Sequence, residues 1–119
     1  MKLVLAEKPS VAQSIAKVLG ANKREDGYLE GSGYVVSWCV GHLVELAKPE
    51  SYDEKYGKWS YNDLPIFPTD WKYNVSSGTK KQFGVLKKLM TRDDVDSLVC
   101  ATDAGREGEL IFRLVYHKA

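Results

Sequence analysis

The chain has 119 residues, a formal net charge of +1 at neutral pH, 44% hydrophobic and 28% charged residues. This length and composition predict one globular domain over residues 1–119, and the balanced charge does not by itself point to a polyanionic partner. There is no apolar stretch of the roughly 18 residues that a membrane-spanning helix needs. Cys39 and Cys100 each lie in an apolar run, which favours two reduced, buried thiols in a cytoplasmic protein over a disulfide framework.

The first expected elements are a strand and a helix joined by a short loop. Leu3–Ala6 is a short apolar run, and the helix is expected to begin with Ser10 as its N-cap and to end at Gly20. Apolar side chains with helical spacing predict the face that packs on the sheet. They are Val11, Ala12, Ile15, Ala16, Val18 and Leu19.

The middle of the chain contains a second strand and a long aromatic segment. The β-branched and aromatic residues of 34–40 follow a glycine-rich turn and predict a strand. Residues 48–74 show little periodicity but contain two of the three tryptophans and four of the seven tyrosines. Such a composition argues against a disordered linker, so we expect an ordered excursion that packs on the domain.

The last part of the chain returns to regular patterns. Residues 79–90 predict a helix with an apolar stripe opposite a lysine face, and 98–101 predict a strand. The helix from Glu107 onward has almost no polar face and is expected to be buried on most sides. Strands that alternate with helices predict an α/β fold, with a mainly parallel sheet flanked by helices on both faces.

Three acidic residues follow predicted strands or begin a predicted helix. Glu7 comes directly after the first strand, Asp103 follows the last strand, and Glu107 stands four residues later. The carboxyl ends of parallel strands meet at one edge of a sheet, where functional groups gather. Carboxylates that converge there repel one another unless a proton or cation lies between them, and oxygen ligands of this kind suit Mg²⁺. The sequence therefore makes Mg²⁺ the expected cofactor.

Basic residues flank these acids. Lys8 and Arg106 are candidates for holding phosphate oxygens, and His42 is either a turn residue or a further contact. Simpler interpretations stay open: Asp103 suits the N-cap of the last helix, and Glu107 suits its positive dipole end. The lysine face of the middle helix is most simply a solvated surface.

Three segments together resemble a known family. They are LVLAEKPSVAQSIAKVLG near the start, VVSWCVGHLVEL in the middle and ATDAGREGELI near the end. In this order they resemble the N-terminal Toprim domain of type IA DNA topoisomerases, and the aromatic segment is similar to that of the bacterial topoisomerase III subfamily. The resemblance covers essentially the whole chain.

The resemblance implies a Rossmann-like Toprim fold and a role in cutting and resealing one DNA strand. It implies that Glu7, Asp103 and Glu107 bind Mg²⁺ and that Glu7 also passes a proton to the leaving 3′ oxygen. Lys8 would steady the scissile phosphate, and Arg106 and His42 would contact DNA. The partners implied are a single-stranded DNA segment and the remaining domains of the same polypeptide, with no membrane.

Two departures from the family pattern matter. Gly105 stands where the family's Asp-x-Asp-x-Glu motif has its middle acid, and the nucleophilic tyrosine belongs to a domain beyond residue 119. We therefore expect the 119-residue chain to be inactive by itself. The alternatives are a Toprim nuclease or primase-like domain, and a degenerate Toprim module that only docks on DNA.

Overall fold

The computed structural model describes residues 1–40, 43–48, 52–57, 60–65 and 72–119. In this part of the chain, a central sheet has the strand order β2-β3-β4-β1-β7, and β5 and β6 form a second, two-stranded sheet. Short 3-10 turns occupy Glu54–Gly57, Tyr61–Asp63 and Ser77–Thr79. The strands and α-helices are β1 (Lys2–Ala6), α1 (Pro9–Leu19), β2 (Lys23–Glu25), β3 (Tyr28–Gly31), β4 (Tyr34–Trp38), β5 (Val44–Leu46), β6 (Tyr73–Val75), α2 (Lys80–Met90), β7 (Ser97–Ala101) and α3 (Arg106–Lys118).

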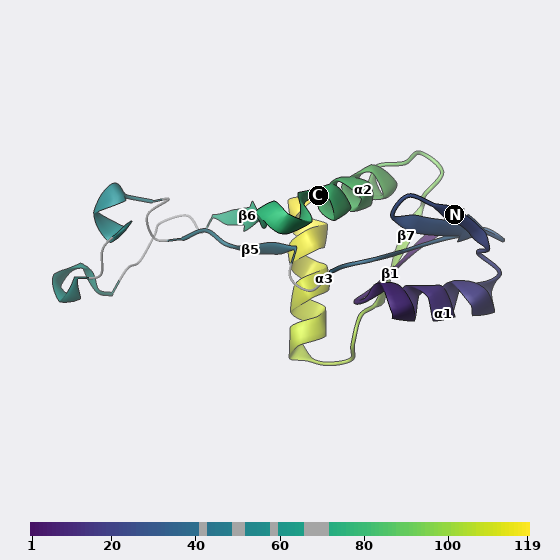
Figure 1. The fold of residues 1–119 in the computed structure, drawn as a ribbon, viewed down its shortest axis with the longest axis horizontal. Coiled ribbons are helices and arrows are strands. Elements are labelled where there is room, and N and C mark those ends of the chain that lie inside the picture. Colours follow the sequence, from purple (N-terminus) through teal and green to yellow (C-terminus); the bar gives the residue numbers. More distant parts are fainter. Residues whose placement is uncertain (41–42, 49–51, 58–59, 66–71) are drawn as a thin grey trace.

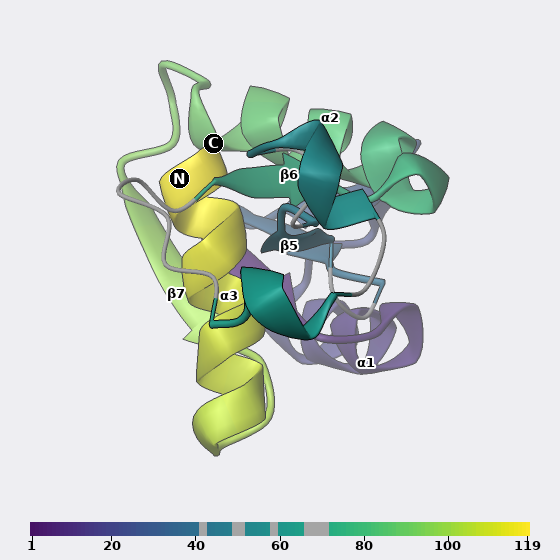
Figure 2. The ribbon, with the colours of Figure 1, turned by 90° about the vertical axis from the view of Figure 1, so that its left-hand side faces the viewer.

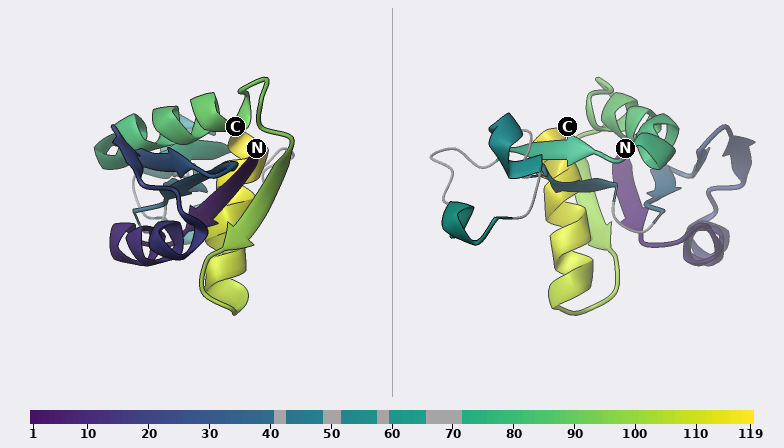
Figure 3. Two further views of the ribbon diagram at one scale, coloured as in Figure 1. Left: turned by 90° about the vertical axis from the view of Figure 1, so that its right-hand side faces the viewer. Right: turned by 60° about the vertical axis from the view of Figure 1, so that its left-hand side comes forward.

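The first strand of the chain lies in the middle of the central sheet. β1 is parallel to both β4 and β7, and Ala6 pairs with Trp38 on one side and with Ala101 on the other. The left panel of Figure 3 shows β1 and β7 side by side and running in the same direction. β2, β3 and β4 are joined as antiparallel hairpins. The predicted α/β fold with a mainly parallel sheet is confirmed.

Helix α1 covers one face of the sheet (Figure 1). Gly20 ends it in the left-handed conformation, as predicted. The predicted N-cap is wrong: Lys8 occupies that position without a side-chain cap, and Pro9, whose ring presets φ, starts the helix. Val18 does not belong to the buried face, since it is 85% exposed and lies about 200° around the helix from buried Ala16.

Helices α2 and α3 cover the opposite face (Figure 1). Leu86 of α2 and Val115 of α3 are fully buried against the sheet. The prediction that the last helix is buried on most sides is wrong, because Leu110 and Tyr116 are 44% and 45% exposed. Only one side of α3 faces the core, which consists of Leu3, Leu5, Val35, Cys39, Leu43, Val44, Leu86, Leu89, Ile111, Phe112 and Val115.

The described residues 52–57 and 60–65 of the aromatic excursion project from the domain on the far side of α3 (Figures 1 and 2). β5 and β6 pair at its base. Beyond them, the backbone N–H of Lys72 donates to the hydroxyl of Tyr52 at 2.7 Å, and the Lys72 ammonium lies 5.3 Å from the centre of the Tyr52 ring. Tyr61 is 92% exposed. The excursion thus meets the domain at its base, where Tyr73 lines a pocket with Leu114 and His117 of α3, while Tyr61 in its outer part is exposed.

A polar cluster joins the loop before β7 to β3, at the amino end of the central strands. The Arg92 guanidinium donates to Glu30 at 2.8 Å and to both carboxylate oxygens of Asp94, at 2.9 and 2.7 Å. The Arg92 guanidinium holds the pKa of the Asp94 carboxyl below its ordinary value. The Arg92 and Glu30 side chains are partly buried, at 30% and 18% exposure, whereas Asp94 is 51% exposed, so the cluster ties the loop to β3 at the rim of the fold.

We expect the 119-residue chain to unfold in a single cooperative thermal transition. Both faces of the central sheet bury apolar side chains within this chain, which is the requirement for an all-or-none transition in a small domain. Circular dichroism during heating and cooling measures it. A gradual, featureless loss of signal would show that the chain needs a further partner to fold.

Candidate functional site

The carboxyl edge of the parallel strands carries the acidic residues predicted from the sequence. Glu7 follows β1 directly, and Asp103 stands two residues after β7. β1 and β7 are parallel and in register, so both acids leave the sheet at the same edge. Glu7 is half-buried and Asp103 is exposed. This edge is where open parallel sheets bind ligands.

The two cysteines flank β1, and they differ in burial. The backbone N–H of Cys39 donates to the carbonyl oxygen of Ala6 at 2.9 Å, which places Cys39 beside Glu7. Burial, with smaller contributions from the Glu7 carboxylate and from Cys100, raises the pKa of the Cys39 thiol to about 12. Cys39 is buried, as predicted, but Cys100 is exposed, because β7 has no neighbour on its outer side among the described residues.

Two glycines shape the turn that carries Asp103. Gly105 has φ 157° and ψ 173°, a conformation that is nearly restricted to glycine, and it directly precedes α3. Its carbonyl oxygen accepts the N–H of Glu109 at 3.1 Å. Gly108 is buried against the backbone of Asp103, and a Cβ atom there would overlap the Asp103 carbonyl oxygen. These glycines allow the Asp103 turn to fold tightly onto the first turn of α3.

Replacement of Gly105 by aspartate is expected to lower the free energy of unfolding by about 1–3 kcal/mol, because its backbone conformation is unfavourable for any residue with a side chain. The added side chain itself meets open space. The matched control is Gly105→Ala, which has the same backbone strain and no charge. Chemical denaturation measures the stability of both variants, and wild-type stability in both would contradict the strain argument.

Calorimetric titration of the same two variants with Mg²⁺ isolates the effect of the added carboxylate on the affinity for the cation. Tighter Mg²⁺ binding by Gly105→Asp than by Gly105→Ala would place position 105 beside the cation. Equal affinities in Gly105→Asp and Gly105→Ala would mean that this position does not face it, and that the family's middle acid has no counterpart here.

The remaining predicted site residues lie at helix starts. Lys8 is the N-cap of α1, while Arg106 and Glu107 belong to the first turn of α3, and all three are exposed. The donor chemistry at this edge, all carboxylate oxygen, suits Mg²⁺. Yet within the described residues no three acidic, histidine or cysteine side chains come close enough to hold a metal ion. His42 lies outside the described residues.

A buried polar network behind β4 was not predicted from the sequence. The hydroxyl of fully buried Ser37 donates to the carbonyl oxygen of Gly27 at 2.7 Å. The amide nitrogen of Gln82 donates to the carbonyl oxygen of Trp38 at 2.8 Å and to the Ser37 hydroxyl at 3.2 Å. α2 is thereby fastened to the end of β4. A serine at a buried position of a strand is the one sequence signal that could have suggested this network.

Together, these features define an α/β domain of the open-sheet class, with an acidic carboxyl edge backed by glycine-shaped turns. Among known protein families, the Toprim domain matches residues 2–119 of the chain. The chain belongs to the Toprim domain family.

Curated relatives agree with this assignment. The chain is 54% identical over 116 residues to DNA topoisomerase 3 of Bacillus thuringiensis (strain Al Hakam), an alignment that covers 98% of the chain. It is 51% identical over 118 residues to DNA topoisomerase 3 of Shouchella clausii (strain KSM-K16), covering 99% of the chain. It is also 51% identical over 117 residues to DNA topoisomerase 3 of Bacillus subtilis (strain 168), covering 98%. In each case the chain spans only 16% of the relative's length.

None of the helices in the described part of the chain has the length and apolar character that crossing a bilayer requires.

Proposed function

We propose that the chain is the Toprim domain of a type IA DNA topoisomerase of the topoisomerase III subfamily, acting in the cytoplasm as part of a longer polypeptide. The observation that carries this proposal is the in-register pairing of β1 with β7, because it brings Glu7 and Asp103 to one edge in a chain that is 54% identical to DNA topoisomerase 3. The substrate is a single-stranded DNA segment at this edge.

In this proposal Glu7, Asp103 and Glu107 would hold Mg²⁺ together with phosphate oxygens of the substrate, because the described residues alone bring no three acidic, histidine or cysteine side chains close enough to do so. The cation would supply positive charge beside the scissile phosphate. Lys8 and the free N–H groups at the start of α1 hold the same phosphate, since the first turn of α1 contains no acidic residue. Arg106 and His42 contact neighbouring parts of the DNA.

Glu7 acts as the general acid for strand cleavage. A tyrosine hydroxyl from another domain releases its proton to water and attacks phosphorus, forming a phosphotyrosine bond, while the bond between phosphorus and the 3′ oxygen breaks. Glu7 donates its proton to that oxygen, which leaves as a 3′ hydroxyl. Resealing reverses each step, so the released 3′ hydroxyl returns its proton to Glu7 as it attacks the phosphotyrosine.

Relaxation of negatively supercoiled DNA tests this proposal. The longer polypeptide is expected to relax it in the presence of Mg²⁺ and to stop when the cation is chelated. The 119-residue chain alone is expected to show no relaxation and no covalent DNA adduct, because it lacks the nucleophile. Gel electrophoresis of plasmid topoisomers measures DNA relaxation, and denaturing electrophoresis of labelled DNA detects the covalent adduct.

The rival functions give different results in the same assays. Nicking of DNA by the 119-residue chain, abolished in Glu7→Gln, would identify a Toprim nuclease. DNA binding by the longer polypeptide without any Mg²⁺-dependent relaxation would identify a module that only docks on DNA.

A further inference from the structure

The polar network of Ser37 and Gln82 lies at the same edge of the sheet as Glu7. Trp38 is the last residue of β4, and it pairs with Ala6, the last residue of β1. Gln82 is the third residue of α2, and its amide nitrogen donates to the carbonyl oxygen of Trp38 at 2.8 Å. The start of α2 therefore holds β4 at the point where the strand ends, beside the strand that carries Glu7.

Gln82 fits tightly among its neighbours. Its amide nitrogen lies 3.2 Å from the hydroxyl oxygen of Ser37 and 3.4 Å from the carbonyl oxygen of Gly27, both within hydrogen-bond distance. A Cβ atom at Gly27 would lie 2.9 Å from the side chain of Val85, so α2 packs directly on the turn before β3. Every buried side-chain nitrogen and oxygen of the described residues has a partner, and a buried polar network in that state is rigid.

A second hydrogen bond carries this constraint to β1. Cys39 follows Trp38, and its backbone N–H donates to the carbonyl oxygen of Ala6 at 2.9 Å. That carbonyl belongs to the peptide bond between Ala6 and Glu7, and a peptide unit is planar, so the hydrogen bond also orients the Cα atom of Glu7. Ala6 and Cys39 are both fully buried. The backbone from which Glu7 projects is thus linked to the amide of Gln82.

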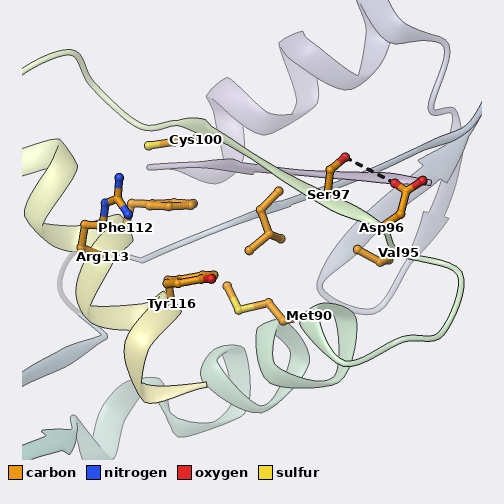
Figure 4. A pocket seen from close by; sticks show the side chains of 9 residues that line it. Met90, Val95, Asp96, Ser97, Cys100, Phe112, Arg113 and Tyr116 are labelled. Atoms are coloured by element: carbon orange, nitrogen blue, oxygen red, sulfur yellow. Dashed lines mark hydrogen bonds between the residues drawn. The ribbon is translucent and has the colours of Figure 1, made fainter.

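The other neighbour of β1 gives less support within the described residues. β7 is the outermost strand of the described sheet, and a groove of about 530 Å³ runs beside it. Figure 4 shows Phe112 and Tyr116 of α3 lining this groove, with Cys100 of β7 at its rim. Cys100 is exposed, whereas Cys39 on the β4 side is buried. The firm support for the carboxyl end of β1 therefore comes from β4 and α2.

We infer that Gln82 is a positioning residue for Glu7: by holding the carbonyl group of Trp38 it fixes the end of β4 and, through the N–H of Cys39, the peptide plane that precedes Glu7. This inference rests on the proposed function, in which Glu7 acts on the DNA. Gln82 acts only through the backbone and does not touch the DNA. A displacement of about 1 Å at a reacting group costs about 100-fold in rate, so support of this kind has a measurable effect on catalysis.

Gln82→Met in the longer polypeptide tests the inference, because methionine has a similar length and no N–H donor. Cleavage of a labelled single-stranded oligonucleotide by excess enzyme with Mg²⁺ gives a rate constant, which an inactive fraction of enzyme does not change. The rate constant is expected to fall about tenfold, while the dissociation constant for the oligonucleotide stays within about twofold. Gln13→Met, the identical change at an exposed position of α1, is the matched control and is expected to alter neither.

Gln82→His separates hydrogen-bond donation from packing. The Nε2 atom of histidine stands as many bonds from the backbone as the amide nitrogen of glutamine and can carry an N–H donor. This variant is expected to recover most of the cleavage rate that Gln82→Met loses. Equal losses in the two variants would attribute the effect to the packing of α2 and overturn the inference. A loss of DNA affinity in step with the rate would also overturn it, since Gln82 would then contact the DNA.

Alkylation of Cys39 reports on the end of β4 without any DNA chemistry. Iodoacetamide reaches this buried thiol only when the strand end opens, and mass spectrometry follows the peptide that contains it. In the longer polypeptide, Gln82→Met is expected to react at Cys39 about tenfold faster than wild type, and Gln13→Met at the wild-type rate. Denaturant titration of the same proteins gives the contribution of complete unfolding, which is subtracted.

The two readouts fail independently. Unchanged labelling of Cys39 in Gln82→Met would overturn the inference even if cleavage were slower, and faster labelling with unchanged cleavage would overturn it as well. A wild-type polypeptide that does not cleave DNA would refute the proposed function, while the labelling would still decide whether Gln82 holds the strand end beside Glu7.

Discussion

Replacement of Gly108 by alanine is expected to lower the free energy of unfolding by about 3 kcal/mol. The new Cβ would overlap the Asp103 carbonyl oxygen and would lie 2.9 Å from its carbonyl carbon and 3.0 Å from its nitrogen. These neighbours are backbone atoms, so the Asp103 turn or α3 must move as a whole, which is the expensive form of overpacking. Denaturant titration measures the loss. In the longer polypeptide, displacement of Asp103 is also expected to weaken Mg²⁺-dependent relaxation.

The matched control is Gly84→Ala. Gly84 also lies within a helix, α2, but a Cβ there meets no atom within 4 Å. Alanine is the better helix former by about 1 kcal/mol, so this variant is expected to be more stable than wild type. The same substitution thus has opposite signs at two helical glycines. Equal stability of the two variants would show that the contact between Gly108 and Asp103 does not constrain the turn.

Replacement of Glu7 by glutamine in the longer polypeptide is expected to slow DNA relaxation by about 100-fold or more. The amide keeps the size of the side chain but neither carries the proton for the 3′ oxygen nor provides negative charge for the cation, and a positioned general acid alone contributes about that factor. Time courses of topoisomer conversion measure the rate. The variant is expected to keep wild-type thermal stability, because Glu7 is only half-buried and lies at the surface edge of the sheet.

Glu109→Gln is the control for this substitution. The Glu109 carboxylate is exposed in the first turn of α3 and pairs with Arg113 at 2.7 Å, so the chemical change is the same at a position outside the proposed site. Its relaxation rate is expected to stay close to that of wild type. A comparable loss in both variants would attribute the effect to overall charge, and an active Glu7→Gln enzyme would remove Glu7 from the catalytic step.

The three α-helices and the parallel strands β1, β4 and β7 could be predicted from the sequence because they depend on local periodicity and turn residues, whereas the short strands β2, β5 and β6 were not predicted. Burial was less predictable, as Val18 and Cys100 show. Val18 belongs to an apolar helix sequence, but two small alanines, Ala12 and Ala16, form the contact with the sheet and leave it outside. Cys100 lies in a strand of interior composition, and its exposure depends on which strands are its neighbours.

The same distinction applies to the candidate site. The rule that parallel strands end at one edge was enough to bring Glu7 and Asp103 together from the sequence. The φ angle of Gly105 and the contact of Gly108 with Asp103 depend on how α3 folds back, which no local pattern specifies. The network of Ser37 and Gln82 joins residues 45 positions apart, so only the assembled fold reveals it.

The central position of β1 has a consequence for how the domain folds. β1 pairs with a strand that is synthesised almost a hundred residues later, since Lys2 is in register with Ser97. β1 therefore stays incompletely paired until β7 has been synthesised. Loops that must close over such long sequence separations lose much conformational entropy before contacts compensate for it, and folding slows as contact order rises. The order of the strands in the sheet thus makes folding wait for the synthesis of β7, almost a hundred residues after the synthesis of β1.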